Sequence, residues 1–268
     1  MVKNLNVYRF DDDTVFHGIG KDYIALLSII EHGLLTKKDA MDKNIPGYRP
    51  NYSISALEKV SVVGLDRDGY GGGEGFEKWI NPNSAQTSLV IDPKKLSVSP
   101  IRPAEYTFVS DEQYIESISP EAIDGLMFPD FFVNYNLSAV LAEDLRVVPI
   151  SKFSTNYNKE GKGQAVIDFI RHYFPDANIT ELEENINKLD FSIRFSGKGS
   201  ETQENKNLRQ IVGKQLAEII CDGKDPNVVD FLQSVVPEHW KLGYATIFSS
   251  RRLDENKAMR EEEKATKS

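Results

Sequence analysis

The chain changes its hydrophobic pattern near residue 158, and this change constrains the fold more than any other feature. Before it, short apolar runs rich in β-branched and aromatic residues are closed by prolines or polar turns, at residues 87–91, 96–99, 106–109, 114–118, 125–128 and 146–150. After it, apolar residues recur at helical spacing, in residues 163–174, 179–189, 204–220 and 227–236. Strands followed by helices, without regular alternation, predict an α+β fold with a mostly antiparallel sheet.

The segment from Val15 to Leu35 predicts a strand, a glycine turn and an amphipathic helix. The strand ends in His17-Gly18, Asp22 is a candidate N-cap, and Gly33 stands where a helix needs a left-handed residue to end. Residues 51–56 predict a second strand. Residues 57–65 are apolar and fit either a strand or the start of a helix.

These patterns divide the chain into three parts. Residues 1–157 carry the strand signals, residues 158–250 form a candidate helical subdomain, and residues 251–268 are a charged tail. Between the early strands, residues 66–84 are rich in glycine and aromatic residues, which fits a flexible surface loop that also serves as a lid or recognition loop.

Composition excludes several classes of function. The net charge of −9 and the pI of about 5.1 argue against a chain built mainly to bind nucleic acid. A single cysteine forbids an internal disulfide, which fits folding in a reducing cytoplasm. The first residues lack the apolar core of a signal peptide, and no stretch approaches the length of a membrane helix, so we expect neither a classical signal peptide nor a membrane span.

Several catalytic motifs are also missing from the sequence. The four histidines are scattered and one cysteine offers no ligand pair, so we expect no zinc site. Cys221 ends an apolar helical run and fits a buried structural residue better than a nucleophile. The sequence has no serine-hydrolase elbow of the G-x-S-x-G type. It has no phosphate-binding loop either, because Asp22 follows Lys21 at the position where such a loop needs serine or threonine.

What remains is an ordered set of motifs on three successive strands. Phe16-His17-Gly18 lies on the first strand, Tyr52-Ser53-Ile54-Ser55 on the second, and Glu112-Gln113-Tyr114-Ile115 on a late one. The helix between the first two ends in Ile29-Ile30-Glu31-His32-Gly33-Leu34. In this order the chain resembles the ADP-ribosyltransferase superfamily, in its branch with His, Tyr and Glu, over residues 10–150.

The resemblance implies a split β-sandwich of short, mostly antiparallel strands with flanking helices, and NAD as the substrate. It implies that Glu112 is catalytic, with Glu116 as the alternative, because a carboxylate stabilises the oxocarbenium-like ribose formed when nicotinamide leaves. The NAD-binding residues that it implies are His17, Gly18, Tyr52, Ser53 and Ser55. Arginine-directed relatives carry Glu or Gln two places before the catalytic Glu, where this chain has Ser110 or Tyr114, so the acceptor side chain stays open.

The function implied is a mono-ADP-ribosyltransferase that acts on a host protein as a bacterial effector. An NAD glycohydrolase of the same fold and a non-catalytic protein-binding module are the alternatives. Glutamates 261–263 near a polar end resemble the translocation signal of type IV-secreted effectors, which predicts export into the host cytoplasm, although such a tail also serves simply to keep the end soluble. The helical half is expected to select the protein target, or alternatively to complete the core.

Overall fold

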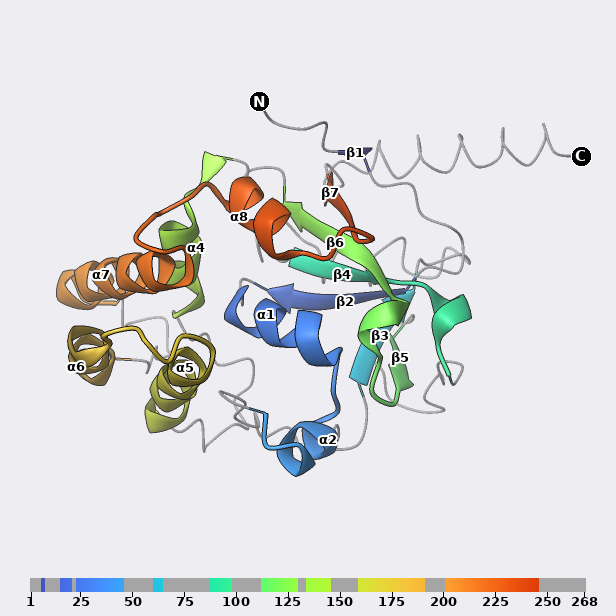
Figure 1. The fold of residues 1–268 in the computed structure, drawn as a ribbon, viewed down its shortest axis with the longest axis horizontal. Helices are drawn as coiled ribbons and strands as arrows, with labels where there is room; N and C mark the ends of the chain where they lie inside the picture. Colours follow the sequence, from blue (N-terminus) through green and yellow to red (C-terminus); the bar gives the residue numbers. More distant parts are fainter. Residues whose placement is uncertain are drawn as a thin grey trace, which may run out of the picture.

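A mixed sheet with helices packed on it forms the core of the molecule, as seen in a computed structural model (Figure 1). The structure describes residues 6–7, 15–20, 23–45, 60–64, 87–97, 112–129, 134–145, 159–190 and 201–245. Helices α1 and α8 lie across the sheet in the view of Figure 1, and α4 to α7 lie beyond one end of its strands. The α+β fold expected from the sequence is confirmed.

Seven strands form the sheet within the described ranges, in the order β1-β7-β6-β4-β2-β3-β5. Strand β2 pairs antiparallel with β3 on one side and with β4 on the other. β3 in turn pairs antiparallel with β5, and β4 with β6. β7 is parallel to both of its neighbours, β1 and β6. The strands are β1 (Asn6–Val7), β2 (Val15–Gly20), β3 (Val60–Gly64), β4 (Thr87–Ile91), β5 (Glu112–Ile115), β6 (Ile123–Pro129) and β7 (Lys241–Ala245).

Central strand β4 is buried along its whole length, so both faces of the sheet are covered there. One face joins the main hydrophobic core under the helices and carries Val15, Leu89, Leu126 and Phe128. The other face carries Phe16, Val90 and Met127, which are buried but lie outside that core. Side chains alternate between the faces of a strand, and this alternation separates the two sets of residues away from the register shifts at Gly18–Gly20 and Val90–Ile91.

Helix α1 (Tyr23–His32) ends at Gly33 for a steric reason. Gly33 has φ +77° and its amide donates to the Ile29 carbonyl at 2.8 Å. A Cβ at this position would lie 2.1 Å from the Ile118 carbonyl oxygen, which hydrogen-bonds to the next residue, Leu34. The predicted helix stop is confirmed. The predicted N-cap Asp22 lies outside the described residues.

The four helices predicted after residue 158 are present as α5 (Lys159–Tyr173), α6 (Thr180–Lys188), α7 (Gln203–Ile220) and α8 (Val228–Val235). Two further helices, α2 (Lys37–Asp42) and α4 (Leu137–Asp144), were not predicted. Helix α7 crosses α4 closely, since a Cβ on Gly213 would lie 2.4 Å from the Ser138 carbonyl oxygen. The C-terminal helices therefore pack directly on an element of the N-terminal half.

The segment 158–250 also supplies a strand that the sequence did not predict. β7 lies between β6 and β1 and pairs with β6 from Lys241 to Ala245. The segment predicted as a helical subdomain therefore also contributes a strand, at residues 241–245. Its apolar residues Leu242 and Tyr244 alternate with Gly243, a pattern too short to be distinguished from a loop.

The other strand predictions have different outcomes. A strand over residues 96–99 is wrong for Leu96 and Ser97, because Asp92 caps a 3-10 turn at Pro93–Lys95 by accepting the Lys94 amide at 2.9 Å. The strand predicted over 114–118 begins and ends earlier, as β5. Within the apolar segment 57–65, residues 60–64 form strand β3. The predicted strands at 51–56, 106–109 and 146–150 lie outside the described residues.

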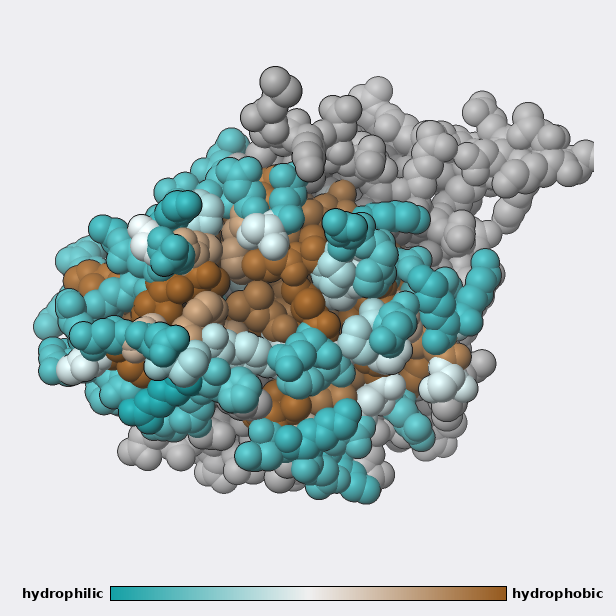
Figure 2. Space-filling view, viewed as in Figure 1, coloured by the Kyte–Doolittle hydropathy of each residue, from teal (hydrophilic) through white to brown (hydrophobic). Residues whose placement is uncertain are grey.

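Apolar side chains gather in a hollow between α1 and α8 (Figure 2). Partly buried residues of these two helices pack against the main core, among them Leu27, Ile30 and Val235. Both helices thus cover one hydrophobic core, although 195 residues separate the end of α1 from the start of α8 in a chain of 268. No helix in the described ranges is both long and apolar enough to span a membrane.

Candidate functional site

The sheet divides between β2 and β3. These strands pair at Val15 and Phe16, and in the described part of both strands the ladder goes no further. β2 nevertheless stays paired to β4 as far as Gly20, and β3 stays paired to β5 as far as Val60. In Figure 1, β3 and β5 accordingly run steeply across the direction of β2 and β4. A fork therefore opens in the sheet just after Phe16.

His17 and Gly18 are the first residues of β2 beyond this fork. Both are half-buried, and their partners on β4 are Leu89 and Ser88. The β2–β4 register then shifts between Gly18 and Gly20, which marks a bulge. Because Gly18 has no side chain, a ligand can approach the backbone at the divided edge closely. The predicted His-Gly motif thus lies at a strand edge that is suited to binding.

Glu112 begins β5, on the far side of β3 from His17. Its Cα partner is Val63, which also pairs with Phe16, so Glu112 lies level with the fork. Two strand spacings separate β2 from β5, roughly 10 Å. The structure therefore brings the strands of His17 and Glu112 within the span of a nucleoside.

The other predicted site residues are distributed differently. Glu116 lies one residue beyond the end of β5 and its side chain is exposed, next to the buried Ile115. Tyr52, Ser53 and Ser55 lie outside the described residues. Of the two glutamates, Glu112 is the one within the sheet.

Sequence reasoning missed three polar residues beside the bulge. Tyr23, which opens α1, shares a hydrogen bond of 2.9 Å with Thr87 of β4, and both side chains are buried. Burial raises the pKa of Tyr23 well above its ordinary value, so this phenol stays protonated and fixes α1 to the sheet. The third residue is Ser88, which is also buried. A polar Thr87-Ser88 pair opening an otherwise apolar strand was the sequence signal for these residues.

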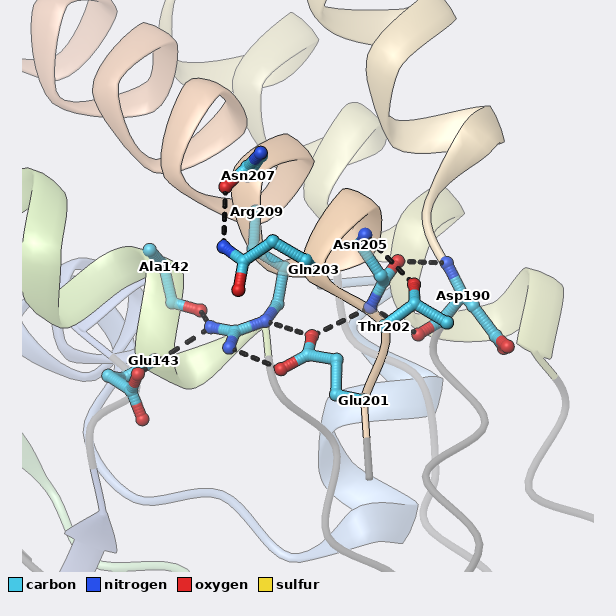
Figure 3. A network of polar contacts seen from close by, with 9 residues as sticks. All are labelled: Ala142, Glu143, Asp190, Glu201, Thr202, Gln203, Asn205, Asn207 and Arg209. Atoms are coloured by element: carbon cyan, nitrogen blue, oxygen red, sulfur yellow. Dashed lines mark hydrogen bonds and ion pairs between the residues drawn. The ribbon is translucent and has the colours of Figure 1, made fainter. Parts of the chain in front are cut away.

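A buried ionic cluster joins α4 to α7 and has a structural role (Figure 3). Arg209 donates to both carboxylate oxygens of Glu201, at 2.6 and 2.7 Å, and also to the Ala142 carbonyl. Glu143 lies 3.7 Å from the guanidinium, and the hydrogen bond to Glu201 is the main cause that raises the pKa of Arg209. Because Arg209 already binds these protein groups and is 4% exposed, the cluster holds two helices together and offers no site for a substrate.

Cys221 has the properties of a structural residue. It follows the last turn of α7 and is half-buried, and its burial, followed by the charge of Asp225, raises the pKa of its thiol. A raised pKa leaves little thiolate at neutral pH, which is the opposite of what a nucleophile needs. In the described part of the chain, no group of three or more His, Cys, Asp or Glu residues is arranged to hold a metal ion.

Comparison with family models, with curated proteins and with solved structures gives no match to this chain. Its function is therefore inferred from its own residues and geometry. The fork beside His17 and Gly18, flanked through β3 by the strand of Glu112, is the candidate site.

Proposed function

We propose that the protein is a mono-ADP-ribosyltransferase, which transfers ADP-ribose from NAD to a protein side chain. The observation that carries the proposal is the adjacency of β2, β3 and β5. It gathers the strand of His17-Gly18 and the strand of Glu112 on the two sides of one fork. The same fork supports a split β-sandwich as the finer description of the fold.

The proposed chemistry breaks the bond between the ribose C1′ and the nicotinamide nitrogen, and nicotinamide leaves with the electron pair. The carboxylate of Glu112 stabilises the positive charge that develops on the ribose. A nucleophilic atom of the acceptor protein then forms a bond to C1′ and loses its proton.

His17 and Gly18 have binding roles in this proposal. The imidazole of His17 holds a ribose hydroxyl by a hydrogen bond. The Gly18 backbone binds the carboxamide of nicotinamide, which the missing side chain allows to approach. The predicted Tyr52 stacks on the nicotinamide ring, and Ser53 and Ser55 complete the NAD site.

The proposal is tested by incubating the full chain with NAD labelled in its adenylate part, with and without eukaryotic cell lysate. Label that becomes covalently attached to a lysate protein supports the transferase. Free labelled ADP-ribose alone identifies an NAD glycohydrolase with the same site. No consumption of NAD contradicts both enzyme functions and favours a protein-binding module.

The same proposal gives the protein the role of a bacterial effector exported into a host cell. It rests on glutamates 261–263, which lie outside the described residues. A reporter enzyme fused ahead of residues 251–268 is expected to enter host cells from a bacterium with a type IV secretion system. Replacing the three glutamates by glutamine is expected to abolish this entry, and unchanged entry would contradict the proposed signal.

A further inference from the structure

The face of the sheet that is turned away from α1 and α8, called here the second face, is buried. Phe16, Val90 and Met127 lie on it, and each is no more than 4% exposed although none belongs to the main core. Gly125 pairs with Val90 on the same face and is also buried. Because Gly125 has no side chain of its own, atoms from another part of the chain lie close over it.

The connection between β3 and β4 has to run the length of the sheet. Both strands pair antiparallel with β2, so they are parallel to each other with β2 between them. β3 ends at Gly64, level with the first residue of β2, and β4 begins at Thr87, level with the last. Residues 65–86 join these two points and lie outside the described residues. The points are roughly 20 Å apart by the spacing of strands and residues in a sheet, a distance that this length of chain crosses easily.

The hand of this connection selects the face on which it crosses. A crossover between parallel strands of one sheet is right-handed in about 98% of cases. β6 and β7 are also parallel, and the chain between them reaches β7 through α8, on the face of the main core (Figure 1). The steps from β6 to β7 and from β3 to β4 both go toward β1 in the strand order, but β6 and β4 are antiparallel. Two crossovers of one hand that step the same way along oppositely directed strands lie on opposite faces, so the rule directs residues 65–86 to the second face.

The sequence of this segment suits the second face. Phe76, Trp79 and Ile80 follow one another at i, i+3 and i+4, the spacing that puts apolar residues on one side of a helix. On the sheet, Val90 lies directly beside Gly125 of β6. The missing side chain of Gly125 leaves room above the sheet for a large aromatic residue.

We propose that residues 65–86 cross the second face of the sheet and dock Phe76, Trp79 and Ile80 on the surface around Val90. The segment is then a layer of the folded core, whereas the sequence alone favoured a surface loop. The inference goes beyond the proposed function and does not depend on it, because neither of its tests uses NAD.

The first test measures whether Trp79 is buried. Trp240→Phe leaves Trp79 as the single tryptophan, and the indole nitrogen that it removes has no hydrogen-bond partner in the part of the chain that the structure describes. We expect the emission of Trp79 to be blue-shifted, and its quenching by iodide to be severalfold weaker, relative to the same chain unfolded in urea. If Trp240→Phe does not fold, the difference between the wild type and Trp79→Phe gives the same quantities. Emission and quenching equal to those of the unfolded chain would overturn the proposal.

The second test identifies the face by double-mutant cycles in urea. Trp79→Ala and Val90→Ala remove two sides of one contact, so the double variant is expected to shift the unfolding midpoint by less than the sum of the single shifts. The matched control is Val62→Ala, the same substitution at a buried strand valine of the main core, and its shift is expected to add to that of Trp79→Ala. Trp79→Leu replaces Trp79→Ala in both cycles if the latter does not fold. Additive shifts for Trp79 and Val90 would overturn the proposal, and coupling of Trp79 to Val62 instead would place the segment on the opposite face and overturn it as well.

Discussion

At the scale of single residues, the question is whether His17 binds a ligand at the fork or only packs within the sheet. It is half-buried on a central strand, directly after the last β2–β3 pair. A histidine in this place can hold a ligand at the fork or simply fill the sheet. Replacement by alanine separates the two roles, because only the first affects NAD.

We predict that His17→Ala weakens binding of carba-NAD, which retains nicotinamide but is not cleaved. It is expected to lower the free energy of unfolding by no more than about 2 kcal/mol, the usual cost of truncating a partly buried polar side chain. Calorimetry and urea unfolding measure the two quantities. The control is His32→Ala, which removes a half-buried histidine at the end of α1, away from the β2–β3 pairs, and is expected to leave the affinity unchanged. Unchanged affinity in His17→Ala would return His17 to a structural role.

Gly33 and Gly223 form a natural pair for measuring a steric effect. Both have positive φ, +77° and +76°, but a Cβ on Gly33 meets the Ile118 carbonyl oxygen at 2.1 Å, while one on Gly223 meets nothing within 4 Å. Gly223→Ala is expected to cost about 1 kcal/mol of backbone strain, and Gly33→Ala more than about 3 kcal/mol, since the clash adds to the strain. Equal losses in urea unfolding would contradict the tight packing of Gly33 on Ile118.

At the scale of elements, the contact of α4 with α7 depends on an ionic cluster in an apolar setting. The Arg209 side chain is 5% exposed and that of Glu201 is 3% exposed, so each charge relies on the other. Removing Arg209 takes the bidentate cation away from the buried carboxylate of Glu201, whereas removing both partners avoids that penalty. The cluster therefore makes the pairing of these helices sensitive to single substitutions.

We predict that Arg209→Met destabilises the protein by about 3–5 kcal/mol, because the carboxylate of Glu201 is left buried without its bidentate partner. The double variant Arg209→Met with Glu201→Leu is expected to recover most of this loss. The matched control, Lys214→Met, removes an exposed cation of the same helix and is expected to cost less than about 1 kcal/mol. A double variant less stable than Arg209→Met alone would contradict this account.

The sequence predicted those elements whose local pattern is strong. The apolar run of β4 and the spaced apolar residues of α5 to α8 are long enough to identify by themselves. The two-residue β1, the glycine-containing β7 and the short α2 and α4 were missed, because partners distant in sequence stabilise them. The N-terminus of α4, for example, has its Ser138 amide bound at 3.0 Å by Asp225, 87 residues away.

For the candidate site, the sequence named candidate residues but not how their strands meet. His17-Gly18 was singled out because the local pattern predicted a strand end there, although β2 continues to Gly20. The separation of β2 from β3 depends on pairing between strands, and no residue of either strand reveals it alone. Ser88 was missed because its burial, and the absence of a hydrogen-bond partner for it among the described residues, are properties of its surroundings.

At the scale of the whole molecule, the C-terminal half completes the core of the N-terminal half. β7 fills the sheet between β6 and β1, and Phe231 of α8 lies edge-on to Tyr23 of α1, with ring centroids 6.2 Å apart. Buried residues from Val15 to Trp240 belong to one hydrophobic cluster. Of the two sequence hypotheses for the helical half, completion of the core is the one that these contacts favour.

We therefore predict that a chain ending at residue 157 does not fold and does not consume NAD, because it lacks β7 and the helices that bury the sheet. Size-exclusion chromatography and thermal melting by circular dichroism measure its state. The control, a chain ending at residue 250, lacks the charged tail alone and is expected to melt like the full chain. A soluble short chain that melts cooperatively would instead support a separate target-selecting subdomain.

The most direct measurement of the central claim is the rate of NAD consumption by the full chain and by Glu112→Gln. The charge of Glu112 matters chiefly in the transition state, so Glu112→Gln is expected to lose at least about a hundredfold in kcat and to bind carba-NAD within a few-fold of the wild type. The control, Glu116→Gln, changes an exposed side chain beyond the end of β5 and is expected to consume NAD normally. A Glu112→Gln variant as active as the wild type would contradict the claim, and loss of activity in Glu116→Gln would transfer the catalytic role to Glu116.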